Sequence, residues 1–256
     1  MQFDTITYAL TDDVAVLCLN RPAVMNALNA LMRAELTEAI GLAGAAARVV
    51  VLTGAGRAFC GGQDLADRTA FSDVEATLND EYVPLLRAIR DCPVPTIAAV
   101  QGAATGAGAN LALTCDVVIA SEQATFVQAF TRIGLIPDAG GTWILPRQIG
   151  LARAMGAMLF ADKITARQAV DWGMIYAAVP DAEFADTWRD RARQLAKGPT
   201  VAYRHLKTAL RDGLTNSLDA QLALEAKLQG ACGQTADFAE GVAAFLEKRP
   251  AQFQGR

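Results

Sequence analysis

The sequence predicts an α/β fold followed by a helical C-terminal third, and three observations support this prediction. The 256 residues are 52% hydrophobic, enough to bury a large core without disulfides or metals. Up to about residue 121, short β-rich runs alternate with helical patterns, an order that favours mostly parallel strands joined by right-handed crossovers. Beyond residue 140, apolar residues recur at the three- and four-residue spacing of amphipathic helices.

The individual elements follow from these patterns in chain order. We expect strands at residues 14–20, 48–54, 95–101 and 116–120. Helices are expected between them at residues 29–44, 74–92 and 106–114. The last third should contain helices at residues 151–161, 166–172, 181–196, 200–212, 217–230 and 235–248.

Composition argues against several classes of protein. The five cysteines are odd in number and form no CxxC pair, so neither a disulfide framework nor a zinc site is expected at Cys18, Cys60, Cys92, Cys115 and Cys232. No segment reaches ~18 consecutive apolar residues and the N-terminus shows no signal pattern, so we expect a cytoplasmic protein without a membrane span. A net charge of -4 without a basic patch indicates no nucleic-acid partner.

Asp138 is the first candidate for chemistry. It is the only carboxylate between residues 123 and 161, and it lies in the apolar and glycine-rich run GLIPDAGGTWILPR. Burial disfavours the charged form of a carboxyl group, so its pKa rises toward neutrality and it can give and take protons. Alternatively, Asp138 caps a helix that begins at the glycines.

Two glycine-rich turns follow predicted strands and lead toward helices, namely TGAGRAFCGGQDL (residues 53–65) and QGAATGAGANLAL (residues 101–113). Such turns can present free backbone N–H groups, and a helix N-terminus adds partial positive charge. Two N–H donors that converge on one point would form an oxyanion hole. Alternatively, glycine only permits tight turns here.

Other enzyme classes fit these motifs poorly. Leu111 and Phe59 stand where a dinucleotide fingerprint needs its third glycine or alanine, so NAD binding is not expected. None of the three serines lies in GxSxG, which argues against a serine hydrolase. His205 is the single histidine, so a histidine-based triad or a multi-histidine metal site is not expected.

Five ordered motifs identify a family resemblance. They are LNRPAVMNALN, VVLTGAGRAFCGGQDL, PTIAAVQGAATGAGANLALTCDVVIAS, GLIPDAGGTWILPR and EGVAAFLEKRPAQF. Over essentially its full length, the chain resembles the crotonase (enoyl-CoA hydratase/isomerase) superfamily. The resemblance implies a crotonase/ClpP-like spiral of ββα units at residues 1–195 and a helical trimerisation region at residues 196–256. It also implies an acyl-CoA substrate, a homotrimer or hexamer, and no cofactor or metal beyond the coenzyme A of the substrate.

The same resemblance implies an oxyanion hole for a thioester enolate. Its two donors would be the backbone N–H groups of Gln63, which follows Gly62, and of Ala107, which lies between Gly106 and Gly108.

Departures from the family pattern favour one reaction. Family hydratases hold water with two glutamates, but Asn110 and Phe130 stand at those positions, and neither side chain is a general base. Asp138 matches the acid/base aspartate of family dienoyl-CoA isomerases and the nucleophilic aspartate of a family dehalogenase. One carboxylate suits an isomerase, which removes a proton from one carbon and returns it at another.

Within the family, the segments GQDL, GAGANLAL, AFTRIGLIPDAGGTWILPR and WGMI resemble ring 1,2-epoxyphenylacetyl-CoA isomerases of phenylacetate breakdown. We therefore expect ring-epoxide isomerisation, double-bond migration in an enoyl-CoA, or both. The alternatives are an enoyl-CoA hydratase and a non-catalytic CoA-binding protein.

Further residues are assigned to the site by the same resemblance. Asn110 could bind the substrate, orient Asp138 or cap a turn. Residues 67–79 are expected to shape the acyl pocket. Substrate or CoA contacts are expected at Ala23, Met25, Arg57, Asp64, Leu65 and Ala66, and, toward a neighbouring subunit, at Phe245 and Lys248. Alternatively, Asp64 is structural and satisfies N–H groups of its loop, and Arg57 and Lys248 are solvated charges.

Overall fold

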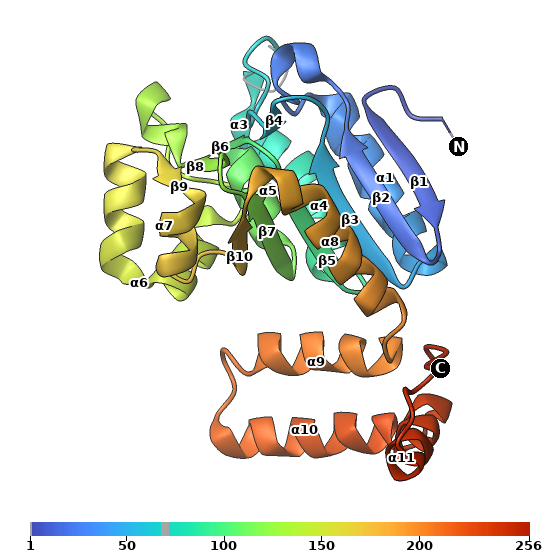
Figure 1. Ribbon diagram of the computed structural model, residues 1–256. Helices are drawn as coiled ribbons and strands as arrows, with labels where there is room; N and C mark the ends of the chain where they lie inside the picture. Colours follow the sequence, from blue (N-terminus) through green and yellow to red (C-terminus); the bar gives the residue numbers. More distant parts are fainter. Residues whose placement is uncertain (1, 68–71) are drawn as a thin grey trace.

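The computed structural model describes residues 2–67 and 72–256, and its centre is an α/β body built on two sheets (Figure 1). The larger sheet has the strand order β1-β2-β3-β5-β7-β10, and the smaller one has the order β4-β6-β8-β9. A separate layer of helices lies below the body in this view.

The larger sheet contains all four predicted strands, as β2, β3, β5 and β7. Its members are β1 (Ile6–Thr11), β2 (Val14–Leu19), β3 (Val49–Gly54), β5 (Thr96–Val100), β7 (Val117–Ser121) and β10 (Ala177–Val179). Only β1 and β2 pair in antiparallel fashion, and the other neighbours are parallel, so the predicted parallel pairing is confirmed.

The smaller sheet consists of very short strands: β4 (Ala58–Cys60), β6 (Ala103–Thr105), β8 (Thr125–Val127) and β9 (Ile164–Thr165). The strand pairs β3–β4, β5–β6 and β7–β8 each place one strand in either sheet, and a helical segment follows each pair. This repetition is the spiral of ββα units that the family resemblance predicts.

Helices cover both sheets. They are α1 (Ala30–Ala46), α3 (Val74–Thr77), the π-helical turn η2 (Leu78–Tyr82), α4 (Val83–Arg90), α5 (Ala107–Thr114), α6 (Gly141–Phe160), α7 (Ala166–Asp171) and α8 (Asp181–Ala196), with short 3-10 helices at η1 (Pro22–Val24) and η3 (Ala129–Ile133). The predicted helix at residues 74–92 is therefore interrupted by a π turn. The helix expected from residue 151 instead begins at Gly141 and is kinked at Gly150.

The central strands β3, β5 and β7 of the larger sheet are buried on both faces. One face packs against α1, α4 and α5 in the main core, and the other packs against Phe184 and Trp188 of α8. Strand β5 is accordingly buried at every residue. This sandwich fixes the strand ends from which the two glycine turns leave.

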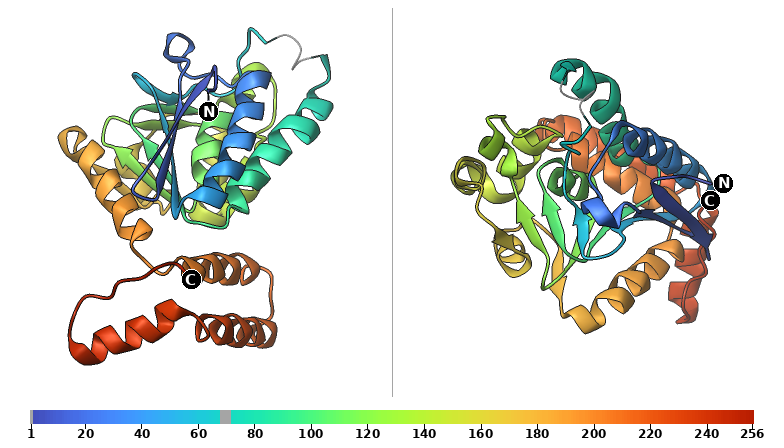
Figure 2. Two further views of the ribbon diagram at one scale, coloured as in Figure 1. Left: turned by 90° about the vertical axis from the view of Figure 1, so that its right-hand side faces the viewer. Right: turned by 90° about the horizontal axis from the view of Figure 1, so that it is seen from above.

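The C-terminal layer contains α9 (Thr200–Asp212), α10 (Leu218–Cys232) and α11 (Ala236–Glu247) (Figures 1 and 2). Arg48 ties it to the body by donating to Thr200 and to the Phe253 carbonyl, and Lys207 and Arg211 pair with Asp116. The layer begins after α8, and the functional division at residue 196 stays a prediction. Among the described residues, no helix has the length and apolar character needed to cross a membrane.

Candidate active site

The two glycine turns lie against each other. Gly62 has a φ of +91° and Gly106 a φ of +54°, conformations that L side chains rarely adopt. A Cβ atom on Gly62 would lie 2.6 Å from the carbonyl oxygen of Thr105 and 3.5 Å from the nitrogen of Ala107. Glycine is therefore required at this contact, and it brings Gln63 and Ala107 to one place.

Two backbone N–H groups remain available at this contact. Leu28 donates to the Gly62 carbonyl (2.7 Å) and accepts from the Asp64 nitrogen (3.0 Å), while no bond from the Gln63 nitrogen is found within the described chain. Ala107 is the first residue of α5, where N–H groups have no partner within the helix and the helix dipole is positive. This pair of donors can stabilise an oxyanion.

Both donors line a cavity of about 250 Å³ between the turns, α3, η2 and η3. Much of its remaining wall is apolar and comes from Leu65, Val74, Leu78, Phe130, Ile133 and Leu135. A thioester carbonyl at the donors would therefore place its acyl group against apolar side chains.

Asp138 lines the same cavity and has the chemistry expected of a proton shuttle. Its Oδ1 atom is buried and has no hydrogen-bond partner among the described residues. Burial raises the pKa of its carboxyl group to about 6. The cap of α6 is Gly140, without a side-chain hydrogen bond, so the alternative in which the Asp138 side chain caps this helix is wrong.

Asn110 contacts the backbone of Asp138 and is fully buried. Its Nδ2 donates to the Asp138 carbonyl oxygen, and its Oδ1 accepts from Gln128 Nε2, both at 2.8 Å. This geometry corresponds to the orienting role among the alternatives for Asn110. Gln128 belongs to no motif that points to chemistry, and sequence reasoning missed it for that reason.

Phe130, which the family resemblance aligns with a glutamate, forms an apolar wall of the cavity. It is buried, and its ring lies 3.8 Å from the place a Cβ atom would take on Gly106. Asp138 is the one carboxylate among the residues that line the cavity. In the part of the chain that the structure describes, no three His, Cys, Asp or Glu side chains are grouped so that they could hold a metal.

The candidate contacts for the CoA nucleotide surround the outer side of the first glycine turn. Ala23 and Arg57 are exposed, and Met25 accepts a hydrogen bond from the Gly61 nitrogen (2.8 Å). A Cβ atom on Gly56 would lie 3.1 Å from Pro22 Cβ, so the two loops are adjacent. CoA binding by Ala23, Met25 and Arg57 stays a prediction.

In the loop after Gln63, one residue stabilises the loop and another borders the cavity. Asp64 is buried, pairs with Arg21 (2.8 Å) and accepts from the Ala66 nitrogen (3.0 Å), so it fixes the loop. Leu65 is 60% exposed at the edge of the cavity, and Ala66 faces solvent.

Gly108 and the segment 67–79 are the next positions that the sequence assigns to the site. A Cβ atom on Gly108 would lie 2.5 Å from the Cys60 carbonyl oxygen, so this glycine allows α5 to approach β4. Of the segment 67–79, Val74, Thr77 and Leu78 line the cavity, while residues 68–71 lie outside the described residues.

Phe245 and Lys248 lie far from this cavity. Phe245 is 82% exposed on α11, and Lys248 follows the same helix. Figure 1 shows α11 at the opposite end of the molecule from α3, β4 and β6. A contact of these residues with CoA would therefore have to be made in another subunit, which stays a prediction.

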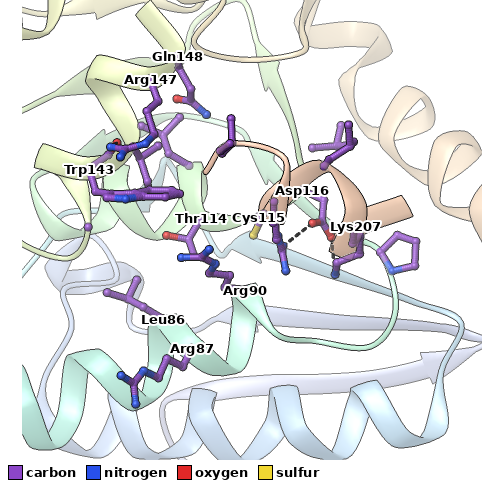
Figure 3. Close-up of a pocket in the computed structure, with 18 of the residues that line it drawn as sticks. Leu86, Arg87, Arg90, Thr114, Cys115, Asp116, Trp143, Arg147, Gln148 and Lys207 are labelled. Atoms are coloured by element: carbon purple, nitrogen blue, oxygen red, sulfur yellow. Dashed lines mark hydrogen bonds and ion pairs between the residues drawn. The ribbon is translucent and has the colours of Figure 1, made fainter. Parts of the chain in front are cut away.

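A larger cavity of about 860 Å³ lies between the body and α9 (Figure 3). On one side, the Trp143 ring stacks with the guanidinium groups of Arg90 (4.9 Å) and Arg147 (4.2 Å). On the other side, Asp116, the one carboxylate in its lining, pairs with Lys207. This cavity lacks both the oxyanion donors and an unpaired acid, so the chemistry is assigned to the smaller one.

Comparison with known proteins also identifies the family of this chain. The sequence matches the enoyl-CoA hydratase/isomerase family over residues 10–256. It is 60% identical to the "Probable enoyl-CoA hydratase" of Rhodobacter capsulatus, with 100% of each chain covered, and 47% identical to the 1,2-epoxyphenylacetyl-CoA isomerase of Escherichia coli, with 95% of each covered. The crystal structure of enoyl-CoA hydratase from Bacillus anthracis has a TM-score of 0.92 at 32% identity, over 99% of this chain and 100% of that one. The chain has the crotonase fold and belongs to the enoyl-CoA hydratase/isomerase family.

Proposed function

We propose that this enzyme is an acyl-CoA isomerase that forms a thioester enolate and moves a proton with Asp138. The observation that carries the proposal is the place of Asp138: its carboxyl group lines the same small cavity as Gln63 and Ala107, and burial raises its pKa to about 6. The ionised form dominates at neutral pH, yet the protonated form is accessible, as a reversible proton carrier requires.

The proton transfer can be written for a 3-enoyl-CoA. Asp138 takes a proton from C2, and the electrons move through the conjugated system to the thioester oxygen, which becomes an oxyanion. The N–H groups of Gln63 and Ala107 stabilise that charge, and each such donor is worth roughly 3 kcal/mol in other enzymes. Asp138 then returns the proton at C4, which leaves a 2-enoyl-CoA and an unchanged enzyme.

The same steps extend to a ring epoxide. In 1,2-epoxyphenylacetyl-CoA, the methylene carbon next to the thioester carries the acidic proton. The ring first enlarges to an oxepin as the bond between ring carbons C1 and C2 breaks and its electrons form a third double bond. Removal of the methylene proton by Asp138 then gives an enolate conjugated with the oxepin. Asp138 returns the proton to a ring carbon, which leaves an isomer of the starting ester. The 47% identity to a 1,2-epoxyphenylacetyl-CoA isomerase supports this substrate.

Hydration of a 2-enoyl-CoA is the second candidate, because the relative at 60% identity is named as a hydratase. In this chain, Asp138 would have to activate the water alone, since Phe130 and Asn110 replace the two family glutamates. Phe130 makes the wall apolar, and Asn110 uses its amide to hold the Asp138 backbone. A non-catalytic CoA-binding role is opposed by the retained acid beside two free N–H donors.

The test is to incubate the enzyme with 3-enoyl-CoA and, separately, with 2-enoyl-CoA, and to identify the products by mass and by thioester conjugation. We expect isomerisation of the 3-enoyl ester, little addition of water, and a loss of isomerisation in Asp138→Asn. Efficient conversion of the 2-enoyl ester to a 3-hydroxy product would instead establish the hydratase. Binding of both esters without turnover would establish the non-catalytic role.

A further inference from the structure

Arg33, in the first turn of α1, is an unusual residue because its charged side chain is completely buried. Its Nη1 atom donates to the Leu28 carbonyl oxygen (2.9 Å) and to Gln63 Oε1 (2.8 Å). Its Nε and Nη2 atoms both donate to Glu81 Oε2, at 2.9 and 2.6 Å. The guanidinium also lies 4.9 Å from the centre of the Tyr82 ring. Three separate chain segments therefore meet at one cation.

Two of these contacts hold the backbone on either side of the Gln63 nitrogen. The backbone of Leu28 forms hydrogen bonds with Gly62 and Asp64, the two residues that flank Gln63. Leu28 and Gln63 therefore form a parallel β-bridge. Arg33 fixes the Leu28 carbonyl and, at the same time, the end of the Gln63 side chain. Gln63 is thus held through the backbone of its two neighbours and through its side-chain amide, while its backbone N–H stays free.

The third segment forms another part of the cavity wall. Glu81 and Tyr82 belong to the π-helical turn η2, and Tyr82 lines the cavity. The Tyr82 hydroxyl donates to Gln63 Oε1 (2.6 Å), the same atom that Arg33 contacts. The acyl-pocket wall and the oxyanion turn are therefore joined through one amide oxygen, and π-helical turns occur frequently at functional sites.

We propose that Arg33 is a positioning residue that holds the Gln63 N–H in the oxyanion hole and couples it to the wall formed by η2. This inference rests on the proposed function, because it assigns Arg33 a role through the oxyanion donor. A donor stabilises an oxyanion only when its distance and direction are correct, so a small displacement of Gln63 lowers the rate. If Arg33 served only the stability of the fold, its substitution would leave the distance and direction of the Gln63 N–H unchanged.

The experiment measures the oxyanion hydrogen bonds directly. Cinnamoyl-CoA labelled with ¹³C at its carbonyl is bound to the enzyme, and the carbonyl stretching band is recorded by infrared difference spectroscopy. Hydrogen bonds to the carbonyl oxygen lower the frequency of this band. Dissociation constants for the same ligand, and kcat and KM for 3-enoyl-CoA isomerisation, complete the measurement.

The variants are Arg33→Met, which keeps most of the packing, and Arg33→Lys, which keeps a cation but cannot reach three partners at once. The matched control is Arg48→Met, which removes another arginine that bonds to backbone carbonyls, far from the cavity. We expect both Arg33 variants to move the band toward its frequency in water and to lower kcat about 10- to 100-fold, with a much smaller change in the dissociation constant. Arg48→Met should leave the band unchanged.

Two results would overturn the inference, and they are distinguishable. If the wild-type band is lowered and either folded Arg33 variant keeps that band and its kcat, the oxyanion hole stands and Arg33 does not position it. If the wild-type enzyme binds the ligand without any lowering, the oxyanion hole itself is wrong, and the proposed function and the role of Arg33 fail together. Arg33→Lys keeps the test available if Arg33→Met does not fold.

Discussion

At Asp138, burial and reactivity are directly linked. The apolar wall that includes Phe130 removes water from the carboxyl group, and the Asn110 amide holds the Asp138 backbone so that the side chain enters the cavity. The resulting rise in pKa, to about 6, makes the carboxylate a stronger base and leaves it mostly ionised at pH 7.

The first prediction concerns the pH dependence of isomerisation. Asp138 must be ionised to accept a proton, so kcat/KM should be level above pH ~7 and fall about tenfold per pH unit below the pKa of about 6. Measuring kcat/KM for a 3-enoyl-CoA from about pH 4.5 to 8 would show this limb. A profile that stays flat down to pH ~4.5 would mean that a carboxyl group with an ordinary pKa is responsible.

The second prediction is that Asp138→Asn stabilises the fold at pH 7. Because the folded-state pKa lies above the unfolded value of about 3.9, the folded state binds more protons between these values, and stability decreases as pH rises through that window. The amide avoids this cost. Since Asp138 is only partly buried, we expect a gain of ~1–2 kcal/mol in the free energy of unfolding.

Urea unfolding of both proteins checks this second prediction. The difference between wild type and variant should be full at pH 7 and should disappear below pH ~4, where both side chains are neutral. An Asn variant that is less stable at pH 7 would show that the charged carboxylate has a stabilising partner.

At the scale of residues, the sequence alone predicts Asp138 as a candidate catalytic residue, because a single acidic residue within an apolar run can be recognised without a structure. The partners of the site are not visible in this way. Arg33, Tyr82 and Gln128 lie far from Gln63 and Asn110 in sequence, and only the packing of α1, η2 and β8 brings them together. Their roles follow from buried hydrogen bonds, which no local spacing encodes.

At the scale of elements, the two glycine turns position the donors, and Gly106 gives a direct test. Its φ of 54° and ψ of -126° are unfavourable for alanine, although a Cβ atom would have only ordinary contacts with Phe130. We expect Gly106→Ala to displace the Ala107 N–H and to lower kcat at least ~10-fold with a smaller effect on KM.

Gly150 offers a matched control for Gly106. It also has a conformation reserved for glycine, with a φ of 77° and a ψ of 158°, and a Cβ atom there would meet no atom within 4 Å. Gly150→Ala should cost a similar ~1–3 kcal/mol of stability and leave kcat close to wild type. Equal kcat values for the two variants, measured with the same 3-enoyl-CoA, would contradict the role of the second glycine turn.

Element prediction succeeds where a segment is long enough to show a pattern. The strands β2, β3, β5 and β7 are runs of five or six residues, and all four were predicted. Strands β4, β6 and β8 have three residues each, too few to show any alternation, and they form only because the larger sheet holds the flanking loops. The order β4-β6-β8 is nevertheless what aligns the two glycine turns.

At the scale of the whole molecule, the C-terminal layer exposes many apolar side chains. Those of α9, α10 and the turn between them include Leu206, Leu210, Leu214, Leu218 and Leu222, each more than half exposed. No residue of α10 is buried within the chain. Exposed apolar surface of this extent is typical of an interface. The homotrimer or hexamer implied by the family resemblance stays a prediction.

The corresponding prediction is a particle of three or six 27.0 kDa chains, measured by light scattering after gel filtration. The double substitution Leu218→Glu and Leu222→Glu should give smaller particles, because charges would be buried at the interface. Leu10→Glu, on β1 and also an exposed leucine, should leave the mass unchanged. A wild-type monomer at micromolar concentration would contradict the assignment.

In the proposed reaction, Asp138 removes a proton from the carbon next to a thioester held by Gln63 and Ala107. The most direct test is the exchange of the C2 protons of phenylacetyl-CoA for deuterium in D2O, followed by NMR, because this ester can form the enolate but cannot rearrange. We predict exchange by the wild-type enzyme and exchange at the background rate in Asp138→Asn, with the ester still bound. Exchange at the wild-type rate in a folded Asp138→Asn variant would contradict the account.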